Sequence, residues 1–147
     1  MAFEIAEQNV DETSELILAG IKDNGVVLAN IIAGHLKQIF NGSVKVIEIE
    51  LNKRQPGEIL LSEELDFSET VVILIDDVTN SGKTLLYALK PFLEFHPKKI
   101  QTLTLVERSH KVFPVTSDYV GVSLATTLQE HIFVEVEGEE VKGAYLV

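Results

Sequence analysis

The chain has 147 residues, with 12 Lys or Arg against 23 Asp or Glu, so its formal net charge is −11. This length is typical of one domain, and we expect residues 1–147 to fold as a single unit. The chain contains no cysteine, which excludes disulfides and thiolate metal sites. The acid excess also argues against RNA as a partner, because an extended nucleic-acid surface neutralises phosphates with Lys and Arg.

The apolar segments are too short for a membrane span. The longest run of aliphatic residues, Val71–Ile75, is far below the ~20 residues that a spanning helix needs. The N-terminus, Met1–Glu7, carries neither a basic segment nor a long apolar run of the kind found in secretory signals. We therefore expect a soluble, cytoplasmic protein that does not bind a membrane.

The first third of the chain predicts a strand, a helix and a second strand. Glu15–Ile21 is a short apolar run that ends in the turn-forming residues 22–25. From Val26 to Phe40 apolar residues recur at spacings of three and four, which predicts a helix that Asn41 and Gly42 terminate. Val44–Leu51 alternates apolar and polar residues near its end, as is typical of a half-exposed strand.

The middle of the chain predicts a central strand followed by a polar loop. Residues 52–69 are rich in charges and predict a loop with at most short structure. Val71–Ile75 is uninterrupted and aliphatic, which indicates a strand covered on both faces. A loop is expected over Asp76–Gly82, and then a helix over residues 85–93 that Pro91 should kink or shorten.

The last third predicts strands of two kinds. Ile100–Val106 continues the strand and helix alternation, so the fold class is α/β, with a mainly parallel twisted sheet flanked by helices. Tyr119–Leu124, His131–Glu137 and Glu140–Leu146 are short, with a hairpin turn around Gly138. We expect these three strands to form a small antiparallel extension of the core.

Residues capable of chemistry concentrate where the predicted central strand ends. Asp76 and Asp77, here called the acid pair, precede residues 79–84 (Thr-Asn-Ser-Gly-Lys-Thr), here called the phosphate loop. Ligands of open α/β sheets bind at the carboxyl ends of strands, and N–H groups at the start of the next helix favour a phosphate. Carboxylates would repel that phosphate, so the acid pair is expected to bind sugar hydroxyls or a hydrated Mg²⁺. The pattern predicts a phosphorylated sugar as ligand.

Two simpler interpretations of this segment fit it less well. Gly82-Lys83-Thr84 matches the end of the nucleotide-binding P-loop, but that motif needs a glycine where this chain has Asp77. The acids and hydroxyls could also be an ordinary strand end and helix cap, since Asp, Ser and Thr are favoured caps. An aliphatic strand, two acids and a small-residue loop in succession are more specific than a cap requires.

This segment resembles the signature with which type I phosphoribosyltransferases bind 5-phosphoribosyl 1-pyrophosphate (PRPP). Gly20–Ala29 resembles the pyrophosphate loop of that family and the helix after it. Leu105–Lys111, continuing to residues 118–121, resembles the hood of the PyrR group, pyrimidine-operon attenuators that also have uracil phosphoribosyltransferase activity. The resemblance spans about residues 15–137 and implies the type I phosphoribosyltransferase fold with a small antiparallel C-terminal hood.

The resemblance implies transfer of the phosphoribosyl group from PRPP to a nucleobase, favouring uracil, with Mg²⁺ as cofactor. The acid pair would be catalytic by holding the ribose hydroxyls, and would hold the metal indirectly through those hydroxyls or water. The remaining roles fall to Thr79, Asn80, Ser81, Gly82, Lys83 and Thr84 for the 5′-phosphate, to Lys22, Asp23, Asn24, Gly25, Lys53 and Arg54 for pyrophosphate, and to Arg108, Val120 and Gly121 for the nucleobase.

Departures from the family pattern keep a second hypothesis open. Asp23 stands where an Arg is common in the PyrR group, and the segment after Leu51 is short for a catalytic loop. Asn80 replaces an Asp that contacts the base in some purine enzymes, which favours a pyrimidine. The alternative is a non-catalytic protein that senses PRPP or a nucleotide. Expected partners are PRPP and a nucleobase or nucleotide, together with a second copy in a homodimer. Amphipathic segments near Phe3, Ile5 and Phe92–Phe95 are candidates for its interface, and a place in the core is the alternative for their aromatic residues.

Overall fold

The structure is a computed structural model that describes residues 1–10, 15–127 and 129–147. Within these residues a six-stranded sheet has the order β3-β2-β1-β4-β5-β6, and β7 and β8 form a separate pair. The elements are α1 (Ala2–Gln8), β1 (Leu16–Ile21), α2 (Asn24–Ile39), β2 (Val44–Glu50), β3 (Leu60–Leu61), β4 (Val71–Thr79), α3 (Lys83–Ala88), the 3₁₀ turn η1 (Lys90–Phe92), β5 (Lys99–Arg108), β6 (Tyr119–Leu124), β7 (Ile132–Glu137) and β8 (Glu140–Leu146).

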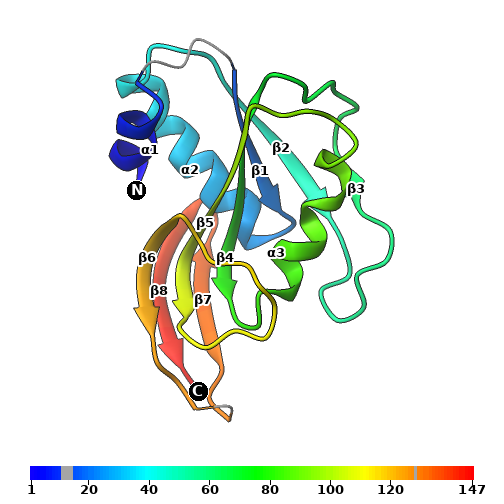
Figure 1. Ribbon diagram of the computed structural model, residues 1–147. Helices are drawn as coiled ribbons and strands as arrows, with labels where there is room; N and C mark the ends of the chain where they lie inside the picture. The colour runs from blue at the N-terminus through cyan, green and yellow to red at the C-terminus, as the bar shows by residue number, and fades with distance from the viewer. Residues whose placement is uncertain (11–14, 128) are drawn as a thin grey trace.

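The helices cover both faces of the larger sheet (Figure 1). Because successive side chains of a strand point to opposite faces, the aliphatic run in β4 divides between two cores. Ile73 and Ile75 pack with α1 and α2, whereas Val72 and Leu74 pack with α3 and η1. All five residues of Val71–Ile75 are fully buried, so the predicted central strand covered on both faces is confirmed.

The helix predicted from Val26 is α2, and it begins two residues earlier, at Asn24. Its apolar side buries Leu28, Ala29, Ile32, Ala33 and Leu36 against the sheet, at the spacings of three and four that a helix face requires. Phe40 ends the helix in an extended conformation. In the described part of the chain, every helix falls short of the length and apolar character that crossing a membrane requires.

Strand β4 is longer than predicted, which corrects the expected loop over Asp76–Gly82. Pairing with β5 continues past the aliphatic run, through Asp76 opposite Thr104 to Thr79 opposite Glu107. The acid pair therefore lies on a strand, and the connection to α3 shrinks to residues 80–82. Helix α3 ends at Ala88, as expected from the nearby Pro91, which lies in η1.

The expected antiparallel extension is correct for β7 and β8 and wrong for β6. Strand β6 pairs in parallel with β5 and completes the main sheet, because residues 109–118 carry the chain back to the start of β5 before β6 begins. Strands β7 and β8 form an antiparallel hairpin that turns at Gly138, with a φ of 63°. The hairpin packs beside α2 and against β4, and it is the small antiparallel C-terminal part that is called the hood from here on. The segments that resemble the hood of the PyrR group, Leu105–Lys111 and residues 118–121, lie instead in β5, β6 and the connection between these two strands of the main sheet.

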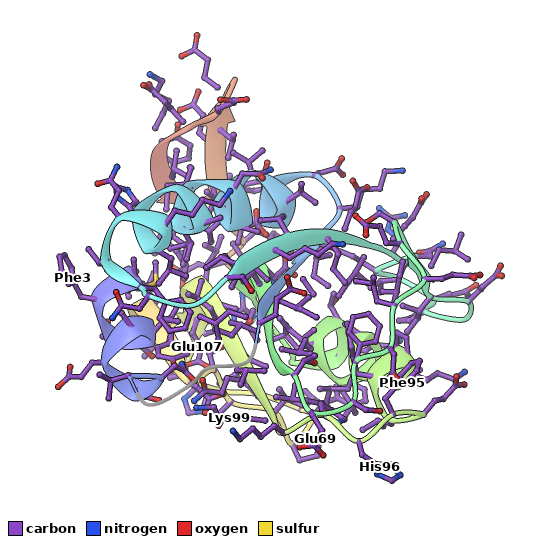
Figure 2. The ribbon with its side chains drawn as sticks, turned by 90° about the horizontal axis from the view of Figure 1, so that it is seen from above. Phe3, Glu69, Phe95, His96, Lys99 and Glu107 are labelled. Atoms are coloured by element: carbon purple, nitrogen blue, oxygen red, sulfur yellow. The ribbon has the colours of Figure 1, made fainter. Side chains whose placement is uncertain are left out.

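The aromatic segments proposed as an interface divide into two kinds. Phe92 is fully buried and packs edge-on against Phe67, with ring centroids 4.8 Å apart, so it belongs to the core. Phe95 packs on the same Phe67 ring at 5.4 Å. Phe3 is 75% exposed and projects from the edge of the molecule (Figure 2). The predicted homodimer therefore depends on Phe3 and its surroundings and stays a prediction.

Candidate functional site

A cavity of about 370 Å³ opens at the carboxyl end of β4. Ligand sites of open α/β sheets lie at this edge, and the acid pair and phosphate loop both contribute to the wall. The rest of the wall comes from the start of α2, from the segment after β2 and from the hood. The lining residues are Asn24, Lys53, Asp76, Asp77, Val78, Thr79, Asn80, Ser81, Gly82, Lys83, Thr84, Leu85, Ile132, Phe133 and Val134.

The start of α2 reaches the acid pair because glycine permits a close approach between two elements. A Cβ on Gly25 would lie 2.7 Å from the carbonyl oxygen of Ile75, so a larger residue would push α2 away from β4. This packing places Asn24 beside Asp77, and Asn24 Nδ2 donates to Asp77 Oδ2 at 2.9 Å. The same amide donates to the carbonyl of Val134 at 3.2 Å. Asn24 thus links the acid pair to the hood.

The acid pair carries an unusual charge arrangement. Asp76 is buried, and Lys53 Nζ lies 3.1 and 3.2 Å from its two carboxylate oxygens and 3.9 Å from Asp77 Oδ1. Burial raises the pKa of Asp76 to about 7, an effect that the Lys53 ammonium opposes and the neighbouring Asp77 carboxylate reinforces. The charge of Asp76 therefore depends on the presence of Lys53 and on pH in the physiological range.

The phosphate loop has the backbone shape and the free hydroxyl that an anion site needs. Gly82 has a φ of 85°, a conformation that favours glycine. Ser81 Oγ accepts from the Lys83 N–H at 3.3 Å, which fixes the turn into α3. Thr79 is buried, and its hydroxyl has no hydrogen-bond partner among the described residues. Because a buried polar atom is costly to leave unpaired, this hydroxyl is a candidate contact for a ligand.

Two predicted pyrophosphate residues, Asn24 and Lys53, line the cavity, whereas the other four lie outside its described lining: Lys22, Asp23, Gly25 and Arg54. Lys22 Nζ pairs with Glu50 at 2.9 Å, and this hydrogen bond raises the pKa of Lys22. Arg54 offers its backbone carbonyl to Lys83 Nζ at 3.3 Å. The positive charge available to a bound anion is therefore concentrated at Lys53 and Lys83.

The residues predicted for the nucleobase also lie outside the described lining of this cavity. Arg108 donates from Nη2 to the carbonyl of Glu130 at 2.6 Å and so holds the segment before the hood. Val120 and Gly121 lie on β6, the edge strand of the main sheet. Their predicted role in base binding stays a prediction.

The sequence reasoning missed the wall that the hood supplies. Ile132, Phe133 and Val134 of β7 line the cavity, and the Phe133 side chain is 54% exposed. An aromatic residue left exposed beside a polar pocket is an apolar surface available to a flat ligand group. The alternating pattern of β7 predicted a strand, but no motif linked it to a strand more than 50 residues earlier in the chain.

Comparisons with known proteins agree with this geometry. The family model described as the phosphoribosyl transferase domain matches residues 1–141. Two curated relatives carry the name Bifunctional protein PyrR. The relative from Ligilactobacillus salivarius is 35% identical over 155 residues, covering 95% of this chain and 86% of the relative. The relative from Streptococcus pneumoniae is 35% identical over 141 residues, covering 92% and 81%.

Solved structures show the same fold at lower identity. A hypoxanthine-guanine phosphoribosyltransferase from Bacillus anthracis has a TM-score of 0.67 at 23% identity, over 89% of this chain and 77% of that one. The hypoxanthine phosphoribosyltransferase of Trypanosoma cruzi has a TM-score of 0.73 at 18% identity, over 84% and 72%. The resemblance and the fold class predicted from the sequence are confirmed. The chain belongs to the phosphoribosyl transferase domain family.

Proposed function

We propose that this protein transfers the phosphoribosyl group of PRPP to a nucleobase, with uracil as the favoured base, and releases pyrophosphate. One observation carries the proposal: the acid pair and the phosphate loop meet in a single cavity that is open to a ligand. The family supports a transferase activity, and the resemblance to the PyrR group supports a pyrimidine. The solved relatives are named for hypoxanthine, so the base itself rests on the resemblance.

The proposed ribose site is the acid pair, whose carboxylates accept hydrogen bonds from the two ring hydroxyls. Lys53 contacts Asp76 in the structure, so a ligand that binds the acid pair has to displace its ammonium group. Lys53 is about half exposed and can swing toward the pyrophosphate leaving group. The displaced ammonium then stabilises the negative charge that develops on pyrophosphate as its bond to C1 breaks. This is electrostatic stabilisation of the transition state.

The proposed site for the 5′-phosphate is the phosphate loop. Thr79, Ser81, Lys83 and Thr84 line the cavity together, and they supply three hydroxyls, one of them unpaired, and an ammonium group. Holding the phosphate and the ribose at fixed positions leaves C1 facing the hood wall, where Phe133 offers an apolar surface for the base. This positioning supplies much of the catalysis in a reaction that needs no covalent nucleophile.

The chemistry of the acid pair fits a magnesium ion that arrives with the ligand. Carboxylate oxygens are ligands that Mg²⁺ accepts. Among the described residues, however, no three His, Asp or Glu side chains come together in a group that could hold a metal. Asp76 and Asp77 would therefore hold the ion through ribose hydroxyls or water, and the ion would neutralise part of the pyrophosphate charge.

A second candidate function is sensing of PRPP or a nucleotide without turnover. The observation that favours it is the shortage of cations for pyrophosphate: Lys22 pairs with Glu50, and Asp23 adds negative charge beside it. Binding a single phosphate needs fewer cations than stabilising a departing pyrophosphate, so the cavity can suit a ligand that it does not turn over.

The two candidates separate in one experiment. Pyrophosphate release from PRPP, with Mg²⁺ and each nucleobase in turn, is compared with calorimetric binding of PRPP and of uridine 5′-monophosphate. We expect release with uracil, and we expect the double variant Asp76→Asn/Asp77→Asn to lower it at least 100-fold, because both ribose contacts lose their charge. Binding without release for every base supports the sensor, and release unchanged in the double variant contradicts the proposed role of the acid pair.

A further inference from the structure

A loop that lies outside the described lining of the cavity makes hydrogen bonds to the phosphate loop. Residues 109–118, between β5 and β6, are here called the brace loop. The N–H groups of Val112 and Phe113 both donate to the carbonyl of Ser81, at 3.1 and 3.0 Å. The carbonyl oxygen of Phe113 also lies 3.2 Å from the position that a Cβ on Gly82 would take. The brace loop therefore contacts two consecutive residues of the phosphate loop.

The contact fixes the direction of a carbonyl group. Val112 and Phe113 lie outside the described lining of the cavity, so the Ser81 carbonyl that they bind is turned away from the ligand space. A carbonyl oxygen that faced the cavity would repel a phosphate, because both carry negative charge. Because the brace loop holds the Ser81 carbonyl outward, this oxygen does not face a phosphate bound in the cavity.

Glu107, at the end of β5, anchors the brace loop at two points. Its Oε1 accepts from the Ser117 N–H at 2.9 Å and pairs with Lys111 Nζ at 2.6 Å. The Glu107 and Lys111 side chains are only 11% and 10% exposed. Burial by itself raises the pKa of Glu107, but the Lys111 ammonium and the Ser117 N–H outweigh it and lower this pKa, so the carboxylate is charged.

We propose that Glu107 is a positioning residue, which holds the brace loop through Lys111 and Ser117 and thereby keeps the phosphate loop in the shape that binds a phosphate. The proposal rests on phosphate binding, which is part of the proposed function, and does not require turnover. A buried ion pair suits this role because removing one partner leaves an uncompensated buried charge, which disturbs the loop that carries it.

The test titrates the protein with orthophosphate and follows the backbone amide signals of Gly82 and Lys83 by NMR. We expect Glu107→Gln and Lys111→Met to raise the apparent dissociation constant for orthophosphate about tenfold, because the loop then holds its binding shape for only about a tenth of the time. Lys111→Arg keeps the charge and should stay within about twofold of wild type. Lys45→Met is the matched control, because it removes the Lys45–Glu63 ion pair at 2.6 Å, outside the cavity lining.

The outcomes decide between this proposal and the proposed function. Unchanged orthophosphate affinity in folded Glu107→Gln and Lys111→Met overturns the positioning role, as does an equal loss in Lys111→Arg or in Lys45→Met. If Glu107→Gln fails to fold, the pair Lys111→Met and Lys111→Arg still decides. A wild-type protein that binds no orthophosphate also overturns it. Orthophosphate binding without release of pyrophosphate contradicts the transfer reaction alone.

Discussion

The two halves of the predicted site are built in different ways. The acid pair and the phosphate loop come from consecutive residues 76–84, all of which line the cavity. The predicted pyrophosphate half combines residues 22–25 with residues 53–54, and of these Asn24 and Lys53 line it. One half is local in sequence and follows from where a strand ends, whereas the other depends on two segments meeting in space.

The halves also differ in electrostatics. The phosphate loop has an unpaired buried hydroxyl and the Lys83 ammonium, in a molecule whose formal net charge is −11. On the pyrophosphate side Lys22 is paired with Glu50, and Lys53 is paired with the acid pair. The proposed binding of one phosphate thus rests on residues at the end of β4 and in the loop after it, while the proposed pyrophosphate chemistry needs Lys53 to change partners.

The largest effect on ligand affinity is expected from damage to the phosphate half. Gly82→Val places a β-branched residue at a φ of 85° and brings its Cβ to 3.2 Å from the Phe113 carbonyl. We expect the free energy of unfolding to fall by about 2 kcal/mol, and orthophosphate affinity to fall about 30-fold, because the loop cannot keep its shape. Urea denaturation and calorimetry measure the two quantities.

Gly34→Ala is the control for this prediction. Gly34 is exposed in the middle of α2, and an added Cβ would meet nothing within 4 Å. This substitution should stabilise the protein by about 0.5 to 1 kcal/mol, since alanine favours a helix more than glycine does. It should leave orthophosphate affinity unchanged. Equal affinity in Gly82→Val and Gly34→Ala would show that the phosphate loop does not bind the anion.

The next effect concerns the acid pair and pH. Asp76 has a pKa of about 7 in the folded protein against a model-peptide value of 3.8, so between these values the folded state holds a proton that the unfolded state has lost. The stability that this proton contributes is complete below pH 3.8 and is lost as pH rises through 7. We expect the unfolding free energy of wild type to fall by a few kcal/mol from pH 5 to pH 8 relative to Asp76→Asn.

Urea denaturation of both proteins at several pH values measures this difference, and parallel pH curves would mean that Asp76 is ionised throughout. Asp77→Asn is the matched variant. It leaves Asp76 in place and removes a neighbouring charge that raises its pKa, so its curve should bend at a lower pH than that of wild type.

A smaller effect is expected from the cation that spans the two halves. Lys53→Met removes the ammonium from the acid pair, which raises the pKa of Asp76 further and takes away one of the two cations in the described lining of the cavity. We expect PRPP affinity to fall about fivefold more than the affinity for ribose 5-phosphate, which has no pyrophosphate to lose the contact. Calorimetry with both ligands measures the ratio. Equal losses would indicate that Lys53 serves the ribose or the phosphate and not the pyrophosphate.

The fold and the β4 half of the site could be predicted because their signals are local. Val71–Ile75 is aliphatic without interruption, and the acids that follow it must lie at the carboxyl edge of the sheet. The end of β4 could not be predicted, because its last residues are held by pairing with Thr104 and Glu107 of β5, which no local pattern encodes. A polar sequence that looks like a loop remains a strand when a neighbouring strand supplies its hydrogen bonds.

Contacts between segments that lie far apart in the chain could not be predicted from the sequence. The resemblance implied that Lys53 binds pyrophosphate, and this role stays a prediction, but the pairing of Lys53 with the buried carboxylate of Asp76 in the structure could not be foreseen. Phe133 lines the cavity because the hood folds back beside α2. The sequence pattern of β7 predicts a strand but does not show where that strand packs. The direction of strand β6 was predicted wrongly for the same reason, since parallel and antiparallel strands of this length have the same sequence pattern.

The smallest effect tests the shortage of positive charge directly. Asp23 has a φ of 73° at the start of α2, so Asp23→Gly relieves an unfavourable backbone conformation and removes a negative charge from the pyrophosphate side. We expect about a threefold gain in PRPP affinity, because a like charge near the ligand is removed.

Glu69→Gly is the matched control, since Glu69 also has a positive φ, 61°, and lies outside the cavity lining. Both variants should gain stability, but only Asp23→Gly should bind PRPP more tightly in calorimetry. An equal gain in PRPP affinity in the two variants would show that the gain comes from relief of backbone strain. The electrostatic difference between the two halves of the site would then have no support.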